Sequence, residues 1–209
     1  MRFFVFVLAG ITLLSCNKKD DSPDDTPSSL NPLQEQWGLV INYTAKWFGP
    51  CGSWGSPTLH EMADMGKVIA VTNHASGDPM HNPVLFNSMD ADRPAGSGIP
   101  SFWVGDIKSS DQASMTQLLE KIPVAGIDMK TSRNGDEFNI TAKVRFFGEG
   151  TGEYYLSFWM LESGIDGSSS AGNYAQAGTT DPGYTHDFVI RKTDGSGIWG
   201  EKATLNSEF

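Results

Sequence analysis

One short stretch, Trp47-Phe48-Gly49-Pro50-Cys51-Gly52, holds the residues of this chain that are best suited to chemistry. Two cysteines separated by two residues, placed where a strand turns into a helix, form a redox pair in many proteins. The first cysteine is the attacking thiolate, and the second resolves the mixed disulfide that forms. In this chain Cys51 stands at the second position, but the first position is Phe48, which has no thiol. A dithiol mechanism and an internal disulfide at this turn are therefore excluded.

The pattern Trp-x-Gly-Pro-Cys resembles the Trp-Cys-Gly-Pro-Cys active site of the thioredoxin superfamily, with Phe48 in place of the first cysteine. The resemblance implies a second feature, which is a turn around a cis proline that faces the cysteine turn. Gly98-Ile99-Pro100, which precedes an apolar run, is the segment that matches it. We therefore expect Pro100 to face the turn from Trp47 to Cys51.

Two interpretations of Cys51 stay open. A sheltered cysteine has a raised pKa and packs like a small apolar residue, which would make Cys51 structural. Alternatively, Cys51 is a working single thiol that acts in mixed disulfides or peroxide reduction. The dipole of the following helix would then favour the thiolate, because it stabilises negative charge near a helix N-terminus. A monothiol pattern offset to Cys51-Gly52-Ser53-Trp54 belongs to this second interpretation.

Several aromatic side chains are expected close to the cysteine turn. They either pack in the core or line an apolar groove beside the proline turn, where thioredoxin relatives bind extended peptides. Pairing between backbones does not need a thiol, so peptide binding can persist after catalysis is lost. The aromatic residues are Trp47, Phe48, Trp54, Phe102 and Trp103. The predicted binding residues are Trp47, Phe48, Gly49, Pro50, Cys51, Ile99 and Pro100.

A strand and a helix must hold this turn. The apolar run Leu39–Tyr43 predicts a strand buried on both faces, and the residues from Trp54 to Met65 have helical spacing. Pro57 predicts a kink in that helix, because a proline removes one backbone hydrogen bond. Further strands are expected at 67–73 and 102–104, and further helices at 84–89 and 109–122. This order favours a layered α/β fold, and we predict a thioredoxin-like domain over residues 37–122.

The loop from His74 to His81 contains two histidines and Asp78. Histidine and carboxylate side chains can bind zinc, but their spacing here matches no metal motif. Loops often contain these residues because their side chains support turns. Hydrolase, metalloprotease and phosphate-loop motifs are also missing from the sequence, so we predict no metal and no cofactor.

After Pro123, the apolar residues recur at every second position instead of at helical spacing. Apolar and polar residues alternate over 138–146 and again over 154–160, which is typical of half-buried strands. Asn134-Gly135 predicts a hairpin, 164–182 is expected to be a long loop, and 187–191 is expected to pair with 198–200 in a second hairpin. We therefore predict an antiparallel β-sandwich domain over residues 123–209. The chain ends where more strands are expected, which predicts an incomplete sandwich with an open sheet edge.

This C-terminal part also resembles a particular family. Tyr184-Thr185-His186-Asp187-Phe188-Val189-Ile190-Arg191, followed by Gly197-Ile198-Trp199-Gly200-Glu201, is similar to a pattern of the outer-membrane-protein-28-related lipoproteins of Bacteroidetes. The resemblance implies a thioredoxin-like domain followed by a β domain, behind a lipoprotein signal. Members of the family often carry both cysteines at the turn, so Phe48 is a departure from it.

The N-terminus predicts a lipid anchor. Residues 1–15 combine one basic residue with an apolar run too short to span a bilayer, as in a secretory signal peptide. The run ends Leu13-Leu14-Ser15-Cys16, which resembles the bacterial lipobox and implies lipidation of Cys16. Residues 16–36 are polar, acidic and rich in proline and serine, which predicts a disordered tether. Lys18-Lys19-Asp20-Asp21 resembles the export signal of Bacteroidetes surface lipoproteins.

Composition limits the remaining functions. The chain has 209 residues and a formal net charge of −10, which disfavours binding to nucleic acid. We predict a lipid-anchored protein of the outer membrane or cell surface that binds a peptide or an envelope protein without catalysis, or has a structural role. The alternative is a single-cysteine oxidoreductase or peroxidase that acts through Cys51.

Overall fold

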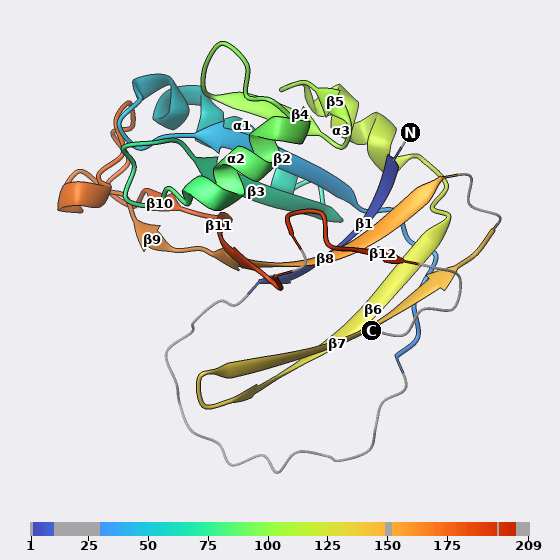
Figure 1. The fold of residues 1–209 in the computed structure, drawn as a ribbon. Coiled ribbons are helices and arrows are strands. Elements are labelled where there is room, and N and C mark those ends of the chain that lie inside the picture. The colour runs from blue at the N-terminus through green and yellow to red at the C-terminus, as the bar shows by residue number, and fades with distance from the viewer. Residues whose placement is uncertain (1, 11–29, 149–151, 196, 204–209) are drawn as a thin grey trace.

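The computed structural model describes residues 2–10, 30–148, 152–195 and 197–203. The fold is mixed α/β, with one large mixed sheet and few helices (Figure 1). The order of strands in the main sheet is β1-β8-β11-β3-β2-β4-β5, and β12 also pairs with β8. Two further sheets have two strands each, β6 with β7 and β9 with β10. The predicted α/β class is therefore confirmed.

Strands β2 to β5 have the layout that the thioredoxin resemblance implies. β2 (Gly38–Thr44) pairs in parallel with β3 (Val68–His74), and a helical crossover joins them. β4 (Ser101–Val104) runs antiparallel to β2, and β5 (Ile107–Lys108) runs antiparallel to β4. Helix α2 (Pro83–Asp92) precedes β4, and helix α3 (Gln112–Leu119) follows β5. The predicted succession of strands and helices is therefore confirmed.

The core lies on both faces of the central strand β2, all of whose residues are buried. Ile41 and Tyr43 pack in one cluster, while Val40 packs in the other with Leu59 and Met62. Successive side chains of a strand point to opposite faces, so a continuous apolar run suits a strand that is covered on both sides. This burial fixes the position at which the chain leaves β2 and enters the cysteine turn.

The helix after the cysteine turn differs from the prediction at its start. It begins as a π-helix, η1 (Cys51–Gly55), and continues as α1 (Ser56–Ala63), with Pro57 in the first turn of α1. A proline is tolerated in a first helical turn, because its missing N–H has no partner there. The predicted kink inside one continuous helix is therefore replaced by a change of helix type just before Pro57.

The C-terminal strands do not form a separate β-sandwich. β8 (Glu153–Glu162) and β11 (Val189–Thr193) extend the main sheet, with β11 inserted between β3 and β8. β12 (Glu201–Ala203) pairs with β8, so the predicted hairpin between 187–191 and 198–200 is wrong. Alternation located β7 (Glu137–Phe146) and β8, but it did not give their buried faces: Phe138 and Ile140 are exposed in β7, and in β8 Met160 is exposed while Trp159 is buried. It also carries no information on which strand becomes the partner.

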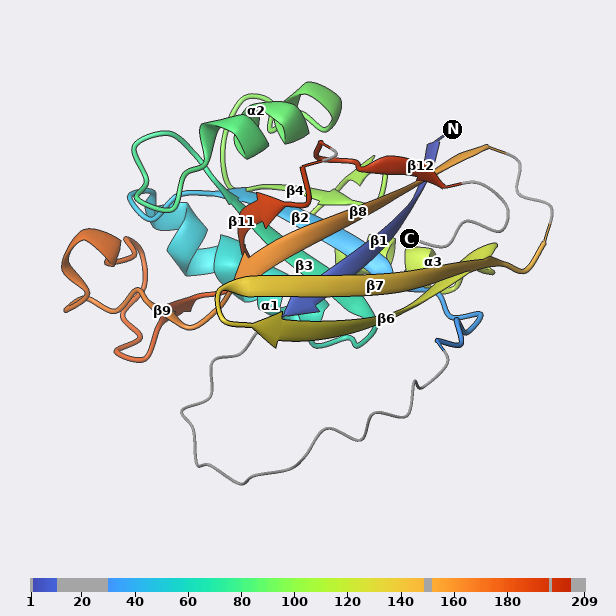
Figure 2. The same ribbon diagram turned by 60° about the horizontal axis from the view of Figure 1, so that its bottom comes forward.

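The predicted hairpin at Asn134-Gly135 is confirmed. β6 (Ala125–Asn134) and β7 (Glu137–Phe146) form a two-stranded antiparallel sheet. Gly135 has a φ of 61°, which suits the turn between the two strands. The hairpin lies against β8 through a small cluster that contains Val144 and Leu156 (Figure 2).

At the N-terminus, β1 (Arg2–Gly10) pairs in parallel with residues 153–161 of β8. These residues belong to the segment 1–15 that is predicted to be a signal peptide. Cys16 and residues 17–29 of the tether lie outside the described residues, so the lipidation remains a prediction. Within the part of the chain that the structure describes, no helix is long and apolar enough to cross a membrane.

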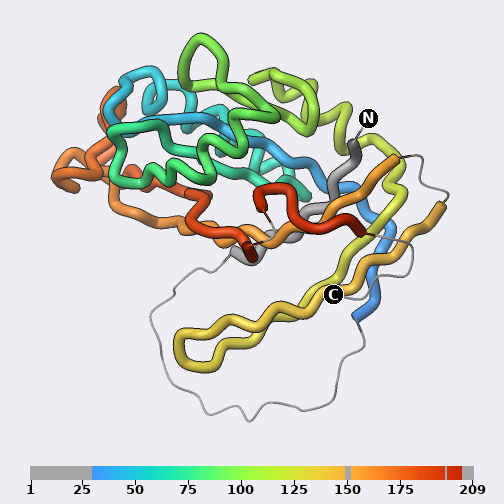
Figure 3. The backbone as a smooth tube through the Cα atoms, viewed as in Figure 1, coloured from blue at the N-terminus to red at the C-terminus, as the bar shows by residue number. Residues whose placement is uncertain are grey.

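The long loop predicted at 164–182 contains short elements. β9 (Ile165–Asp166) pairs with β10 (Thr185–His186), and a 3-10 helix, η2 (Gly172–Tyr174), lies between them. We call residues 167–184 the cap loop. Figure 3 shows this orange segment beside the blue segment that contains the cysteine turn.

Candidate functional site

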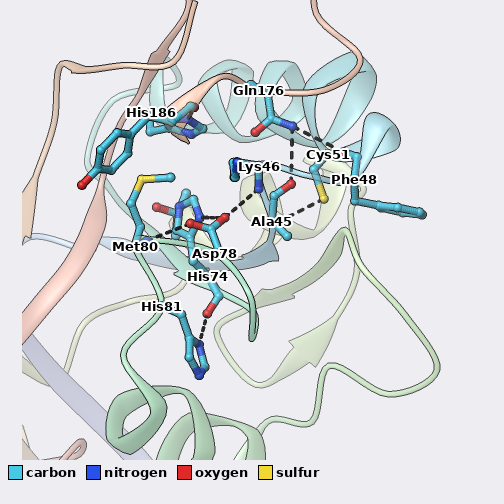
Figure 4. Close-up of polar contacts among 12 residues, drawn as sticks. Ala45, Lys46, Phe48, Cys51, His74, Asp78, Met80, His81, Gln176 and His186 are labelled. Atoms are coloured by element: carbon cyan, nitrogen blue, oxygen red, sulfur yellow. Dashed lines mark hydrogen bonds and ion pairs between the residues drawn. The ribbon is translucent and has the colours of Figure 1, made fainter. Parts of the chain in front are cut away.

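The cysteine turn is held by its own backbone. The N–H of Phe48 donates to the carbonyl of Ala45 at 3.2 Å, and the N–H of Cys51 donates to the carbonyl of Phe48 at 3.0 Å. The Trp47 side chain is 49% exposed and makes an edge contact with the Phe48 ring. Figure 4 shows the Phe48 ring pointing away from the interior polar groups. Phe48 therefore supplies an apolar surface at the position of the attacking thiol.

Cys51 is sheltered, with only 1% of its surface exposed. Its Sγ accepts a hydrogen bond from the N–H of Ala45 at 3.4 Å. Burial raises the pKa of the Cys51 thiol, and the nearby charge of Asp78 raises it further, although hydrogen bonds from Thr44 and Ala45 oppose this. The protonated form is therefore favoured, as expected for a structural cysteine.

The cap loop lies directly on the cysteine turn, which the sequence did not predict. The N–H of Ala177 donates to the carbonyl of Lys46 at 2.7 Å. The Gln176 side-chain amide is buried, donates to the carbonyl of Ala177, and lies 3.4 Å from the carbonyl oxygens of Ala45 and Phe48 (Figure 4). A segment more than a hundred residues away thus covers one side of the turn that contains Cys51.

Two glycines make this close approach possible. A Cβ on Gly178 would lie 1.9 Å from the carbonyl oxygen of Gly49, and Gly178 has a φ of 81°. A Cβ on Gly52 would lie 2.3 Å from the carbonyl oxygen of Ala177. Glycine is suited to both positions because it has no Cβ and adopts positive φ at little cost.

The proline turn lies against the same helix start. The peptide bond between Ile99 and Pro100 is cis, as predicted. A Cβ on Gly55 would lie 2.8 Å from the Cβ of Pro100, so Pro100 packs on the end of η1. Ile99 is half-buried, and neither its N–H nor its carbonyl has a hydrogen-bond partner within the described residues. This backbone is therefore free to pair with an added strand.

The aromatic residues divide between surface and core. Trp54 is 42% exposed, and its ring lies 5.9 Å from that of Phe102, which is buried. Trp103 lies on the opposite face of β4, where its indole N–H donates to the carbonyl of Pro94. Among these aromatic residues, Trp47 and Trp54 are the exposed ones, and the aromatic groove beside the proline turn remains a prediction.

The loop after β3 holds a buried histidine–carboxylate pair. Nδ1 of His74 donates to Oδ2 of Asp78 at 2.9 Å, and both side chains are almost fully buried. The same carboxylate accepts the N–H of Lys46 at 2.6 Å and the N–H of Met80 at 2.8 Å (Figure 4). Asp78 therefore joins this loop to the first residues of the cysteine turn.

The electrostatics of Asp78 follow from these partners. Burial opposes ionisation of its carboxyl group, but the hydrogen bond and charge of His74 outweigh it, together with the two backbone N–H groups. The pKa of Asp78 is therefore lowered, and the carboxylate stays charged in the interior.

His81 has a different partner from the pair. Its Nδ1 donates to the carbonyl of His74 at 2.6 Å, so its ring supports the loop. Within the described residues, no group of three or more histidine, cysteine or acidic side chains could hold a metal ion. The geometry of this loop is that of a structural turn.

His186 and Tyr184, at the C-terminal end of the cap loop, complete the polar interior. The two rings lie 5.2 Å apart, and the His186 ring lies 5.6 Å from that of His74. Burial lowers the pKa of His186, although the carbonyl of Tyr174, which accepts from its Nε2 at 2.8 Å, opposes this. The sequence pattern that carries the family resemblance includes His186. The pattern indicated this residue, but it did not indicate that the ring packs against His74.

A small cavity lies between the cap loop, β2, β3 and α1. Its volume is about 10 Å³, roughly the space that one water molecule needs. His74 and Asn42 both line it, and within the described residues Nε2 of His74 and Oδ1 of Asn42 are buried without a hydrogen-bond partner. The other polar groups that line it include Thr44, Ser56, His60, Thr72, Tyr184 and His186. A polar cavity of this size can hold one water molecule.

The fold and the turn together describe a mixed α/β protein with a thioredoxin-like layout, in which Phe48 stands where a dithiol site has its first cysteine. Among solved structures, HBP35 of Porphyromonas gingivalis is similar, with a TM-score of 0.63 and 15% sequence identity. The alignment covers 85% of this chain and 62% of that chain, so this chain spans less than two thirds of the matched protein. At this identity the likeness shows the fold alone. No family model matches the chain, and the search of curated proteins gives no significant match.

Proposed function

We propose that this protein binds an extended peptide, or an extended segment of an envelope protein, without catalysis at the proline turn. The observation that carries the proposal is the contrast between two neighbouring groups. Cys51 is buried and covered by the cap loop, while the backbone of Ile99 is half-buried and unpaired among the described residues. The turn has therefore lost access for thiol chemistry but keeps an open backbone edge.

The binding mode is the addition of a short strand. The N–H and carbonyl of Ile99 would pair with the backbone of the ligand, and the exposed rings of Trp47 and Trp54 would contact its side chains. Tryptophan contributes strongly to interfaces because it buries a large apolar surface. The net charge of −10 favours ligands that are not acidic.

Isothermal titration with unstructured apolar peptides tests this mode. Trp54→Ala should weaken binding by about tenfold, a typical loss for an aromatic side chain at an interface. Trp37→Ala is the matched control, because Trp37 is 51% exposed and lies at the other end of β2. N-methylation of each peptide amide in turn should abolish binding at one position only, the amide that pairs with Ile99. Equal losses for both tryptophan variants would contradict the site.

The proposed location is the outer membrane or cell surface, through lipid on Cys16. The lipobox-like sequence that ends at Cys16 supports this, and so does the polar segment that follows it. The similar structure comes from a Bacteroidetes species, which fits the family resemblance loosely. Metabolic labelling with an alkyne fatty acid should modify the wild type but not Cys16→Ser. Protease digestion of intact cells should then show whether the protein faces outwards.

A further inference from the structure

The cap loop is attached to the rest of the fold at three places. At its tip, the N–H of Ala177 bonds to Lys46 of the cysteine turn. At its base, β9 pairs with β10, and the N–H of Gly167 donates to the carbonyl of Tyr184 at 3.0 Å. The third attachment is His186, which follows the cap loop and packs on His74 of β3.

The contact between His186 and His74 brings together two buried imidazole rings. The rings meet edge to face with centroids 5.6 Å apart, and both residues are almost fully buried. Nε2 of His186 donates to the carbonyl of Tyr174, so a second proton on His186 would go to Nδ1. A charge on His186 would be poorly solvated there, because the residue is only 4% exposed.

The carboxylates near His186 are engaged elsewhere. Asp78 faces it from the loop after β3, but the oxygens of Asp78 already accept bonds from His74, Lys46 and Met80. Asp166 faces it from β9 and accepts a bond from the N–H of Ser168.

The remaining neighbours of His186 come from β10 and α1. Asp187 pairs with His60 of α1 at 3.6 Å and accepts bonds from Gly164 and Thr185. Tyr184 packs on His186 as a neutral ring, since burial raises the pKa of its hydroxyl group. The charges of Asp78 and Asp187 favour a proton on His186, but burial outweighs them, and no carboxylate within the described residues is hydrogen-bonded to its ring.

We propose that the cap loop is an acid-released cover of the cysteine turn. When His186 takes up a second proton beside His74, the cap loop leaves the turn and exposes Cys51. The cavity lined by His74 and His186 gives water a place to enter as the loop lifts, and Nε2 of His74 is buried without a hydrogen-bond partner within the described residues.

The direction of the pH dependence follows from burial. Burial lowers the pKa of His186, so the ring is neutral near pH 7 and the cap loop is closed. The closed state loses stability as the pH falls below about 6.5, the ordinary value for histidine, towards the lowered value in the fold. This inference rests on the proposed function, because release of the cap loop would regulate the turn beside the proposed peptide site. The test of release uses no peptide, so its failure can be distinguished from a failure of peptide binding.

Hydrogen exchange of the full chain, read by mass spectrometry and corrected for the intrinsic rate at each pH, tests the release. Protection of residues 45–49 and 174–178 should fall by about tenfold between about pH 8 and pH 5.5. Protection of the buried strands β2 and β3 should stay unchanged, which separates local release from unfolding. In His186→Gln, which keeps a donor but cannot be charged, the fall should be less than about twofold. His60→Gln is the control and should behave like the wild type.

The wild type alone provides a second test, in case His186→Gln does not fold. The NMR titration of the His186 ring should have a midpoint below about 6.5, and protection should fall as the pH drops from about 6.5 towards that midpoint. Equal protection at both pH values, an undiminished fall in His186→Gln, or simultaneous loss of protection in β2 and β3 would overturn the proposal.

Discussion

Phe48 and Cys51 show how one side chain changes the chemistry that a turn can perform. The backbone of the turn closes as a thiol site requires, with the N–H of Cys51 bonded to the carbonyl of Phe48. The sulfur that remains lies in the interior, where burial raises its pKa. A buried neutral thiol reacts slowly, because the thiolate is the reactive form.

Alkylation measures the state of Cys51 directly. At pH values where the cap loop is closed, we expect almost no labelling of the native chain and rapid labelling after denaturation. The reason is the combination of 1% exposure and a raised thiol pKa. Labelling can be followed by intact mass, and Cys16→Ser removes the other cysteine. Fast native labelling with a midpoint below about 8.5 would instead support the single-thiol enzyme.

Restoring the missing thiol tests the alignment with thioredoxins. In Phe48→Cys we expect a reducible disulfide with Cys51, since the two residues span one closed turn. The bridge would be detected as a mass difference after alkylation with and without reductant. Ser53→Cys, on the other side of Cys51 and exposed, is the control and should stay reduced. A failure of Phe48→Cys to form the bridge under oxidising conditions would show that the resemblance does not extend to side-chain geometry.

Asp78 is the residue on which the stability of the turn depends most. Asp78→Asn should destabilise the protein by about 3 kcal/mol at neutral pH, because it removes a buried charge that His74 and two N–H groups stabilise. The pKa of Asp78 is lowered in the fold, so its contribution is fully present above about 3.9. The contribution is lost as the pH falls through the folded value.

Urea unfolding of the wild type and Asp78→Asn should therefore give free energies that differ at neutral pH and converge below about pH 4. Asp136→Asn is a useful control, since Asp136 is fully exposed in the β6–β7 turn. A difference that stays constant down to acidic pH would mean that the charge of Asp78 is not what stabilises the loop.

At the scale of elements, the contact between the tip of the cap loop and the cysteine turn depends on Gly178. Gly178→Ala should detach the tip of the loop, because its Cβ would overlap the Gly49 carbonyl. Gly172→Ala is a matched control in the same loop, with a φ of 59° but no atom within 4 Å of the added Cβ. We expect both variants to lose about 1 kcal/mol from positive φ. Only Gly178→Ala should make Cys51 accessible to alkylation in the native state, and equal labelling of the two would contradict the role of the contact.

The elements that the sequence predicted well are those with local signals. The apolar runs identified β2 and β3, Asn134-Gly135 identified the β6–β7 turn, and Ile99-Pro100 identified the cis peptide bond. The sequence could not predict that β11 inserts between β3 and β8, because pairing between distant strands leaves no periodic trace. The cap loop was missed for the same reason, since its contacts join residues that lie far apart in the chain.

At the scale of the whole molecule, the C-terminal strands and the thioredoxin-like layout share one sheet. β8 and β11 continue the sheet beyond β3, so residues 153–193 stabilise the element that carries the His74–Asp78 pair. A change in these strands can therefore affect the cysteine turn through β3 and the cap loop. HBP35 has a similar fold, although the two sequences are only 15% identical.

If residues 1–15 are a signal peptide, as we predict, the pairing of β1 with β8 implies that the precursor and the exported form would have different sheets. If residues 1–15 are removed during export, residues 153–161 of β8 lose their parallel neighbour along a whole side. Backbone groups uncovered in this way attract other strands, including those of a second molecule. A chain that starts at Cys16 should thus exchange the amide protons of these residues faster than the precursor, by about tenfold or more. Removal of residues 1–15 would, in this way, convert a paired strand of the precursor into an open sheet edge to which a strand of another molecule could add.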